Sequence, residues 1–183
     1  IHSVPLIVNY DTSGSNALII VGANDGMLHA FDDATGAEEW AFIPPDVLGN
    51  LNELRPGQSA THPFFVDASP KVYNGPSGEK TLVFGLGRGG RAYYGIDISS
   101  KTAPKLLWRV NDSTSGYAEL GLTMSTPAMT KYAGAAGAPV AVVGGGYDLH
   151  FDDPAESSAN TTDPMGRTIY VIDLATGSKL AQA

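Results

Sequence analysis

The chain has 183 residues, of which 43% are hydrophobic, so it can form a sizeable core and its composition argues against disorder. Eleven Lys and Arg residues against nineteen Asp and Glu give a formal net charge of −8, which disfavours nucleic acid and anionic membrane surfaces as partners. The absence of cysteine excludes disulfide frameworks, thiolate zinc sites and cysteine nucleophiles.

No apolar run approaches the roughly 18 residues that span a bilayer, so membrane insertion is not expected. No signal peptide is visible, and the chain opens at Ile1 rather than at a methionine. We therefore expect a fragment or mature piece of a longer protein. The 22 glycines and 12 prolines are spread along the chain, which is typical of many short strands joined by tight turns.

Two hairpin turns mark the first predicted unit, at about residues 1–45. Asn24-Asp25-Gly26 stands between two apolar runs, where Asn and Gly tolerate the positive φ that such turns require. A second turn is predicted at 33–36. The turns separate four predicted strands, at 1–10, 17–23, 27–32 and 38–43.

A connection at 45–62 follows the first unit. Apolar residues at helical spacing within Pro45–Leu54 predict at most a short helix packed on the rim. They are Val47, Leu48, Leu51 and Leu54.

The same strand order recurs at about 62–111 and 122–183, the last unit containing a second insertion at 145–166. Three units of four antiparallel strands, without a convincing helix, predict an all-β fold. We interpret the units as about three blades of a larger β-propeller. The strands predicted in the second unit are 64–73, 80–85, 91–98 and 105–110, and those in the third are 123–132, 139–144, 168–174 and 178–183.

The third predicted strand of the first unit ends in an aspartate that begins a recurrent turn. Asp32, Gly36 and Trp40 fit the A-x-D-x-x-x-G-x-x-x-W pattern of quinoprotein-type propeller blades. The aspartate can accept N–H bonds from the turn, and the glycine can take a positive φ. The tryptophan can pack flat against the neighbouring blade. The pattern therefore predicts a structural role rather than catalysis.

The other two units repeat this pattern with changes. Asp97 leads to Trp108 through a turn that is three residues longer. Asp173 leads to Gly177, with Ala181 at the tryptophan position. We expect both tryptophans of the chain to be buried between adjacent sheets.

Motifs that would carry catalysis are incomplete. Residues 85–90 formally match G-x-G-x-x-G, but a strand is predicted after them instead of the helix that would hold a pyrophosphate. The histidines lack zinc-site spacing, and the stretch at 57–61 lacks the last glycine of a nucleophile elbow. The histidines are His2, His29, His62 and His150. We expect no enzymatic activity and no cofactor in this chain.

The second insertion is rich in oxygen ligands, which calcium prefers. Their spacing matches no D-x-D-x-D-G loop, which favours a solvated acidic surface loop and leaves a metal site as the alternative. The candidate metal ligands are Asp148, Asp152, Asp153, Glu156 and Asp163, with His150 and Asn160 between them.

Several segments resemble the PilY/PilC family of type IV pilus tip-associated adhesins. The longest are 24–45 (NDGMLHAFDDATGAEEWAFIPP) and 80–98 (KTLVFGLGRGGRAYYGIDI), with shorter matches at 66–70, 142–147 and 169–177. The resemblance covers nearly the whole chain. It implies part of the C-terminal β-propeller domain of that family.

The resemblance also implies a secreted parent protein at the pilus tip or the outer membrane surface. Such a protein supports pilus assembly, opposes retraction and mediates adhesion to host cells or surfaces. The implied partners are pilin or minor pilin subunits and the remaining blades of the propeller. Family members carry a D-x-D-x-D calcium loop in this domain. These 183 residues contain no such loop, so the resemblance assigns no calcium ligand to this chain and implies calcium in the parent protein, with the loop expected further along.

Two other function classes stay open. One is a fragment of a quinoprotein-type dehydrogenase, and the other is a periplasmic or outer-membrane assembly-factor propeller that binds proteins.

Three blades would leave two end faces without a neighbour. We therefore expect the chain to self-associate or to complete a ring with a second polypeptide. The apolar residues expected on strands packed on both sides are Ile19, Val21, Val83, Val142 and Ile169.

Overall fold

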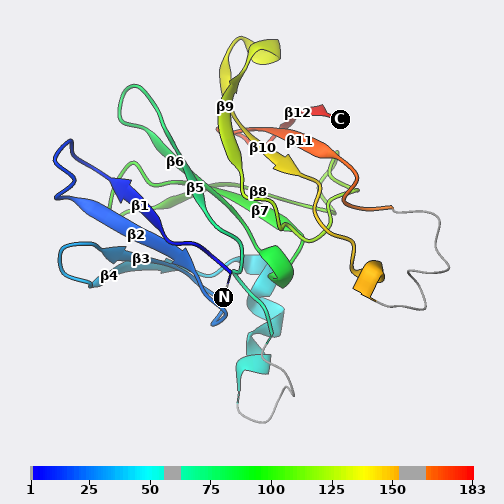
Figure 1. Cartoon of the computed structure of the whole chain (residues 1–183), viewed down its shortest axis with the longest axis horizontal. Helices are drawn as coiled ribbons and strands as arrows, with labels where there is room; N and C mark the ends of the chain where they lie inside the picture. The colour runs from blue at the N-terminus through cyan, green and yellow to red at the C-terminus, as the bar shows by residue number, and fades with distance from the viewer. Residues whose placement is uncertain (1, 56–62, 153–163) are drawn as a thin grey trace.

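The computed structural model of the chain describes residues 2–55, 63–152 and 164–183. Its strands form three four-stranded antiparallel sheets, in which strands adjacent in sequence are adjacent in space. Figure 1 shows blade 1 (β1–β4) and blade 3 (β9–β12) on either side of blade 2 (β5–β8). The predicted all-β fold with propeller-like blades is confirmed.

The strands are four to seven residues long. Blade 1 consists of β1 (Leu6–Asn9), β2 (Ala17–Gly22), β3 (Leu28–Asp32) and β4 (Glu38–Phe42). Blade 2 consists of β5 (Lys71–Asn74), β6 (Lys80–Gly85), β7 (Ala92–Asp97) and β8 (Lys105–Asn111). Blade 3 consists of β9 (Ala128–Tyr132), β10 (Ala138–Gly144), β11 (Ile169–Asp173) and β12 (Lys179–Gln182).

The first strand of each blade is shorter than the sequence pattern predicted. β1, β5 and β9 each begin at the residue after a proline, namely Pro5, Pro70 and Pro127. Proline has no N–H to donate to a sheet ladder, so pairing starts only beyond it.

Two hydrophobic cores hold the blades together. The first lies between blades 1 and 2 and includes Leu18, Ile20, Leu28, Leu82, Phe84 and Tyr94. The second lies between blades 2 and 3 and includes Val83, Tyr93, Trp108, Val110, Tyr170 and Ile172. Alternate residues of β6 and β7 contribute to different cores, so blade 2 is buried on both faces.

The connection after blade 1 forms a 3-10 helix, η1 (Pro45–Leu54). Val47 is fully buried in the first core, whereas Leu48 is 54% exposed, so only one side of η1 packs against the blades. Short 3-10 turns form η2 (Gly87–Gly89), η3 (Ala133–Ala135) and η4 (Leu149–Asp152). Within the described residues, no helix has the length and apolar character needed to cross a membrane.

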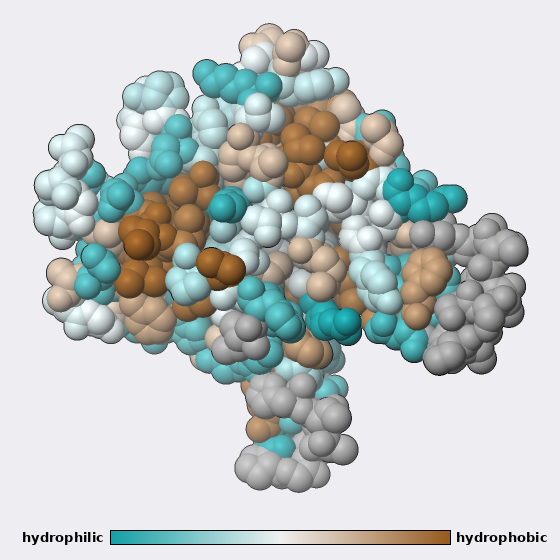
Figure 2. Space-filling view, viewed as in Figure 1, coloured by the Kyte–Doolittle hydropathy of each residue, from teal (hydrophilic) through white to brown (hydrophobic). Residues whose placement is uncertain are grey.

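The outer faces of blades 1 and 3 carry apolar side chains that no further sheet of the described residues covers. On blade 1, Ile7 is 61% exposed and pairs with Ile19 on the same face of the sheet. On blade 3, Ile169 is 51% exposed, and Val142 pairs with Val171. Figure 2 shows one hydrophobic patch over β1 and β2 and another over β10 and β11.

Candidate functional site

The turns after β3 and β11 are built by an aspartate and a threonine. The Oδ1 atom of Asp32 accepts hydrogen bonds from the Thr35 N–H at 2.8 Å and the Thr35 hydroxyl at 2.7 Å. In blade 3, Asp173 Oδ1 accepts from the Thr176 N–H and hydroxyl, each at 2.8 Å. The two turns are therefore near duplicates in their hydrogen bonding.

A glycine closes each of these two turns in the same conformation. The φ angle of Gly36 is 72° and that of Gly177 is 73°, in the left-handed region that favours glycine. The Gly36 N–H donates to the Asp32 carbonyl at 2.8 Å, and the Gly177 N–H donates to the Asp173 carbonyl at 2.9 Å. The backbone of the two turns is therefore equivalent as well.

The corresponding turn of blade 2 differs. Asp97 accepts hydrogen bonds from the N–H and hydroxyl of Ser99, and Lys101 stands where the other two turns have glycine. The Lys101 ammonium donates to Asp32 of blade 1 at 2.5 Å and to Asn16 at 2.8 Å. Its hydrogen bond to Asp32, together with those from Thr35, lowers the pKa of Asp32 to about 2. This side chain therefore ties blade 2 to blade 1.

Each tryptophan joins its blade to the docking turn of the next blade. The Trp40 indole N–H donates to the Lys101 carbonyl at 3.0 Å. The Trp108 indole N–H donates to the Leu174 carbonyl at 2.7 Å. Trp108 is 6% exposed, whereas Trp40 is only partly buried. The two indole contacts run in the same direction along the chain.

Glycines hold the Trp108 ring on both sides. A Cβ atom placed on Gly95 would lie 2.2 Å from the ring, and one placed on Gly177 would lie 2.8 Å from the Trp108 side chain. A Cβ on Gly36 would meet no atom within 4 Å among the described residues. Blade 1 therefore presents the same docking turn as blade 3, but without an indole on it.

A carboxylate of η1 anchors this connection to blade 2. Asp46 accepts a hydrogen bond from Arg109 Nε at 2.6 Å and further hydrogen bonds from the other arm of Arg109 and from the Tyr94 hydroxyl. Although burial raises the pKa of Asp46, these hydrogen bonds lower it below its ordinary value. The sequence pattern did not predict this cluster, because the partners of Asp46 lie 48 and 63 residues away from it along the chain.

The acidic residues of the second insertion are bound to protein groups where the structure describes them. Asp148 is 7% exposed and lies 3.0 Å from His150 Nδ1. Asp152 accepts a hydrogen bond from the Tyr147 hydroxyl at 2.8 Å. In the described ranges, no three His, Asp or Glu side chains form a group that could hold a metal ion. The other candidate ligands, Asp153, Glu156 and Asp163, lie outside the described residues.

The glycines at 85–90 make close backbone contacts between segments. A Cβ on Gly85 would lie 2.6 Å from the Thr123 carbonyl oxygen, and one on Gly89 would lie 1.7 Å from the Phe65 carbonyl oxygen. The short turn η2 and then β7 follow, so within the described part of the chain no α-helix begins after these glycines. These glycines allow close packing and do not build a dinucleotide site.

The histidines are dispersed, and His62 lies outside the described residues. The His29 ring lies between two carboxylates, with Glu38 2.6 Å from Nδ1 and Asp25 2.9 Å from Nε2. Burial lowers the pKa of His29, but these hydrogen bonds outweigh that effect and raise it. The buried Asp67, which lies 2.6 Å from His2 Nδ1, was also not predicted from the sequence pattern.

Consecutive four-stranded sheets, stacked in chain order and joined by tryptophan docking, define part of a β-propeller. The sequence model described as the PilY1 beta-propeller domain matches residues 8–181. The chain therefore belongs to the PilY1 β-propeller family, as the sequence resemblance indicated.

Proteins similar to this chain include PilY1 proteins from two bacterial species. The chain is 38% identical over 143 residues to the type IV pilus biogenesis factor PilY1 of Pseudomonas aeruginosa strain UCBPP-PA14, covering 75% of the chain and 12% of that protein. It is 34% identical over 166 residues to a PilY1 homolog of Xylella fastidiosa strain Temecula1, covering 87% of the chain and 10% of that protein. The crystal structure of the P. aeruginosa PilY1 C-terminal domain superposes with a TM-score of 0.65 at 27% identity, covering 91% of this chain and 29% of that chain. The chain thus spans a small part of the length of these relatives.

Proposed function

We propose that the chain is a scaffold segment of the propeller of a type IV pilus biogenesis protein, outside the cytoplasm at the cell envelope or pilus. The names of its relatives support the pilus assignment. The tryptophan docking turns support the scaffold role, since their side chains are engaged in holding one blade to the next.

The single observation that carries this proposal is the uncovered docking turn at Gly36. It repeats the hydrogen bonds and backbone of the turn at Gly177, on which Trp108 rests. A turn of this design accepts an indole from an adjoining blade. Blade 3 has Ala181 at the tryptophan position, so it cannot supply that indole to a second copy of the chain. The occupant is therefore a different blade of the parent protein.

In the finer form of the proposal, the parent protein supports pilus assembly, opposes retraction and contributes to adhesion. Its partners are pilin or minor pilin subunits, and the propeller acts as a rigid platform without enzymatic activity. Any calcium site belongs to a part of the parent beyond these residues.

The proposal is tested by complementation in the source bacterium. The gene of the full-length protein is deleted and replaced by wild type, by Trp108→Ala or by Leu106→Ala. Trp108 is buried between blades, whereas Leu106 lies on the same strand and is 49% exposed, so it serves as the matched control.

We expect Trp108→Ala to lower the amount of pilin sheared from the surface, and Leu106→Ala to behave as wild type. If the protein opposes retraction, pili should return in the Trp108→Ala strain when the retraction motor is also removed. Normal piliation in the deletion strain itself would refute the pilus function.

A further inference from the structure

A cavity of about 430 Å³ opens between blades 2 and 3. Arg88 of η2 borders it from blade 2, and the segments before β9, after β10 and before β11 form the other walls. Met124 and Ser125 lie in the first of these segments. The volume is within the range of about 300–1,000 Å³ that is common for small-molecule sites.

Backbone atoms of glycines form much of the wall. Gly146 has a φ of 101°, and a Cβ on it would lie 2.4 Å from the Leu122 carbonyl oxygen. Gly166 has a φ of 79°, and its Cβ would lie 2.3 Å from the Gly146 carbonyl oxygen. Side chains cannot be added at these positions without moving backbone. The wall is therefore preformed, and the exposed Met124 side chain adds an apolar surface to it.

Arg88 is the one charged side chain among the described residues that line the cavity. Among the described residues, the carboxylate paired with Arg88 is that of Asp152, 3.8 Å away, which is too long for a hydrogen bond. Its guanidinium lies 5.8 Å from the centre of the Phe64 ring. By contrast, Arg109 is held by two hydrogen bonds to Asp46. No described residue accepts a hydrogen bond from the Arg88 guanidinium. Arg88 thus offers these N–H donors to a ligand.

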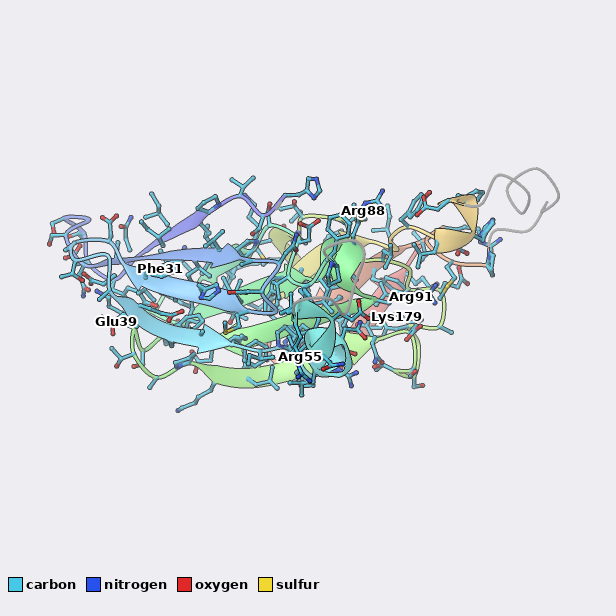
Figure 3. The ribbon with its side chains drawn as sticks, turned by 90° about the horizontal axis from the view of Figure 1, so that it is seen from below. Phe31, Glu39, Arg55, Arg88, Arg91 and Lys179 are labelled. Carbon is cyan, nitrogen blue, oxygen red and sulfur yellow. The ribbon has the colours of Figure 1, made fainter. Side chains whose placement is uncertain are left out.

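Figure 3 shows Arg88 and Arg91 at separate positions in the molecule. Arg91 does not line the cavity and donates a hydrogen bond to Asp112 at 3.4 Å. The two arginines lie three positions apart in sequence and are both partly exposed, at 42% and 32% of the side chain. Arg91 is therefore a matched control for Arg88.

We propose that this cavity binds a ligand that carries a carboxylate next to a small apolar group. The planar guanidinium of Arg88 can form paired hydrogen bonds with a carboxylate, which would replace the long contact with Asp152. Ser125 Oγ accepts the Gly144 N–H at 3.1 Å, so its own hydroxyl proton can be donated to the ligand. The apolar group would lie against Met124 and the glycine wall. This inference does not depend on the pilus function proposed above.

The first test uses the full chain with ¹³C-labelled methionine methyl groups and N-acetyl-L-leucine as the probe. We expect a saturable shift of the Met124 methyl signal with a Kd of about 1 mM, a typical affinity for a small probe with one charged anchor. The Met27 signal should stay fixed, because Met27 lies in blade 1 next to β3. The neutral N-acetyl-L-leucinamide should bind about tenfold more weakly or worse, since it lacks the charge.

Arginine variants supply the second test. Arg88→Leu should weaken binding of the probe about tenfold or more. Arg88→Lys should bind the probe with an affinity between those of Arg88→Leu and wild type, because lysine keeps the charge but cannot form the paired hydrogen bonds of the guanidinium. Arg91→Leu should bind as wild type. Thermal unfolding of each variant checks that the fold is retained. Equal binding by Arg88→Leu and wild type, equal binding of the amide, or no saturable Met124 shift up to about 50 mM would each overturn the proposal.

A last comparison identifies the source of the carboxylate. A hexapeptide ending in a free leucine carboxylate should bind more tightly than the single residue if the natural ligand is a polypeptide C-terminus. Equal affinities would identify a free small organic acid.

Discussion

Trp108 shows how one residue can fix the relation between two blades. Its indole N–H reaches the Leu174 carbonyl, and its ring is held between Gly95 and Gly177. Trp40 makes the corresponding hydrogen bond but is only partly buried, and the place of Gly177 is taken by Lys101. The two tryptophans share a sequence pattern but differ in how much surface they bury, so their energetic roles should differ too.

We predict that Trp108→Ala lowers the free energy of unfolding by about 3–5 kcal/mol, as for other buried aromatic side chains. Trp40→Ala should cost less, because part of its ring already contacts water. Urea denaturation measures both changes, with Leu106→Ala as the exposed control. A cost for Trp108→Ala below about 1 kcal/mol would show that the ring is not buried between the blades.

The two equivalent glycines allow the indole contact to be separated from backbone strain. Gly36→Ala and Gly177→Ala both place a side chain at a φ near 72°, which costs roughly 1–2 kcal/mol each. Only the second also pushes a methyl group into Trp108. Gly177→Ala should therefore destabilise the isolated chain more than Gly36→Ala. Equal losses in urea titrations would mean that the docking contact adds nothing to stability.

His29 gives a prediction for pH dependence. Its pKa in the folded chain is raised, so its protonated form contributes stability that is fully present below the unfolded value of about 6.5. This contribution is lost as the pH rises through the folded pKa. The difference in Tm between wild type and His29→Gln should therefore be largest below about pH 6.5 and shrink as the pH rises above that value. NMR titration of His29 is the direct check, and a midpoint at or below 6.5 would contradict the prediction.

At the scale of elements, the sequence pattern predicted the turns and strands that form between residues close together in the chain. The turn at Asn24-Asp25-Gly26 and the alternating strands around it could be predicted, because hairpins and two-residue periodicity are local. The contacts of Asp46 and Asp67 could not be predicted, since their partners are brought near only by blade packing. Nothing in the composition of the η1 segment distinguishes a partly buried aspartate that anchors the helix from a solvated one.

The anchoring of η1 by Asp46 can be tested at the same scale. Asp46→Asn removes the charge that Arg109 and Tyr94 contact, so we expect a loss of about 1–3 kcal/mol in unfolding free energy. Hydrogen exchange within η1 should become faster than in blade 3. Asp33→Asn, at an exposed position, is the control. Unchanged exchange in η1 would show that the hydrophobic contact of Val47 suffices to hold it.

At the scale of the whole molecule, the chain has two different ends. Blade 1 offers a docking turn without an indole, and blade 3 offers an outer strand without a tryptophan. Ala181 pairs with Val171, whose neighbours Tyr170 and Ile172 face the second core, so Ala181 lies on the outer face of blade 3. Both outer faces are apolar, so self-association of the purified chain stays a prediction, which light scattering can test. The missing indole, however, should make such contacts weak.

Restoring the indole should therefore convert weak contacts into head-to-tail assembly. In Ala181→Trp, the new side chain would face outward from blade 3, as Trp108 faces outward from blade 2 towards blade 3. It could then rest on the turn at Gly36 of a second copy, and we expect association at least about tenfold stronger than in wild type. Sedimentation velocity measures this, and adding Gly36→Ala, whose methyl group would meet the incoming ring, should reverse it. Association that survives Gly36→Ala, or an Ala181→Trp chain that associates no more than wild type, would show that the turn at Gly36 is not a tryptophan docking site.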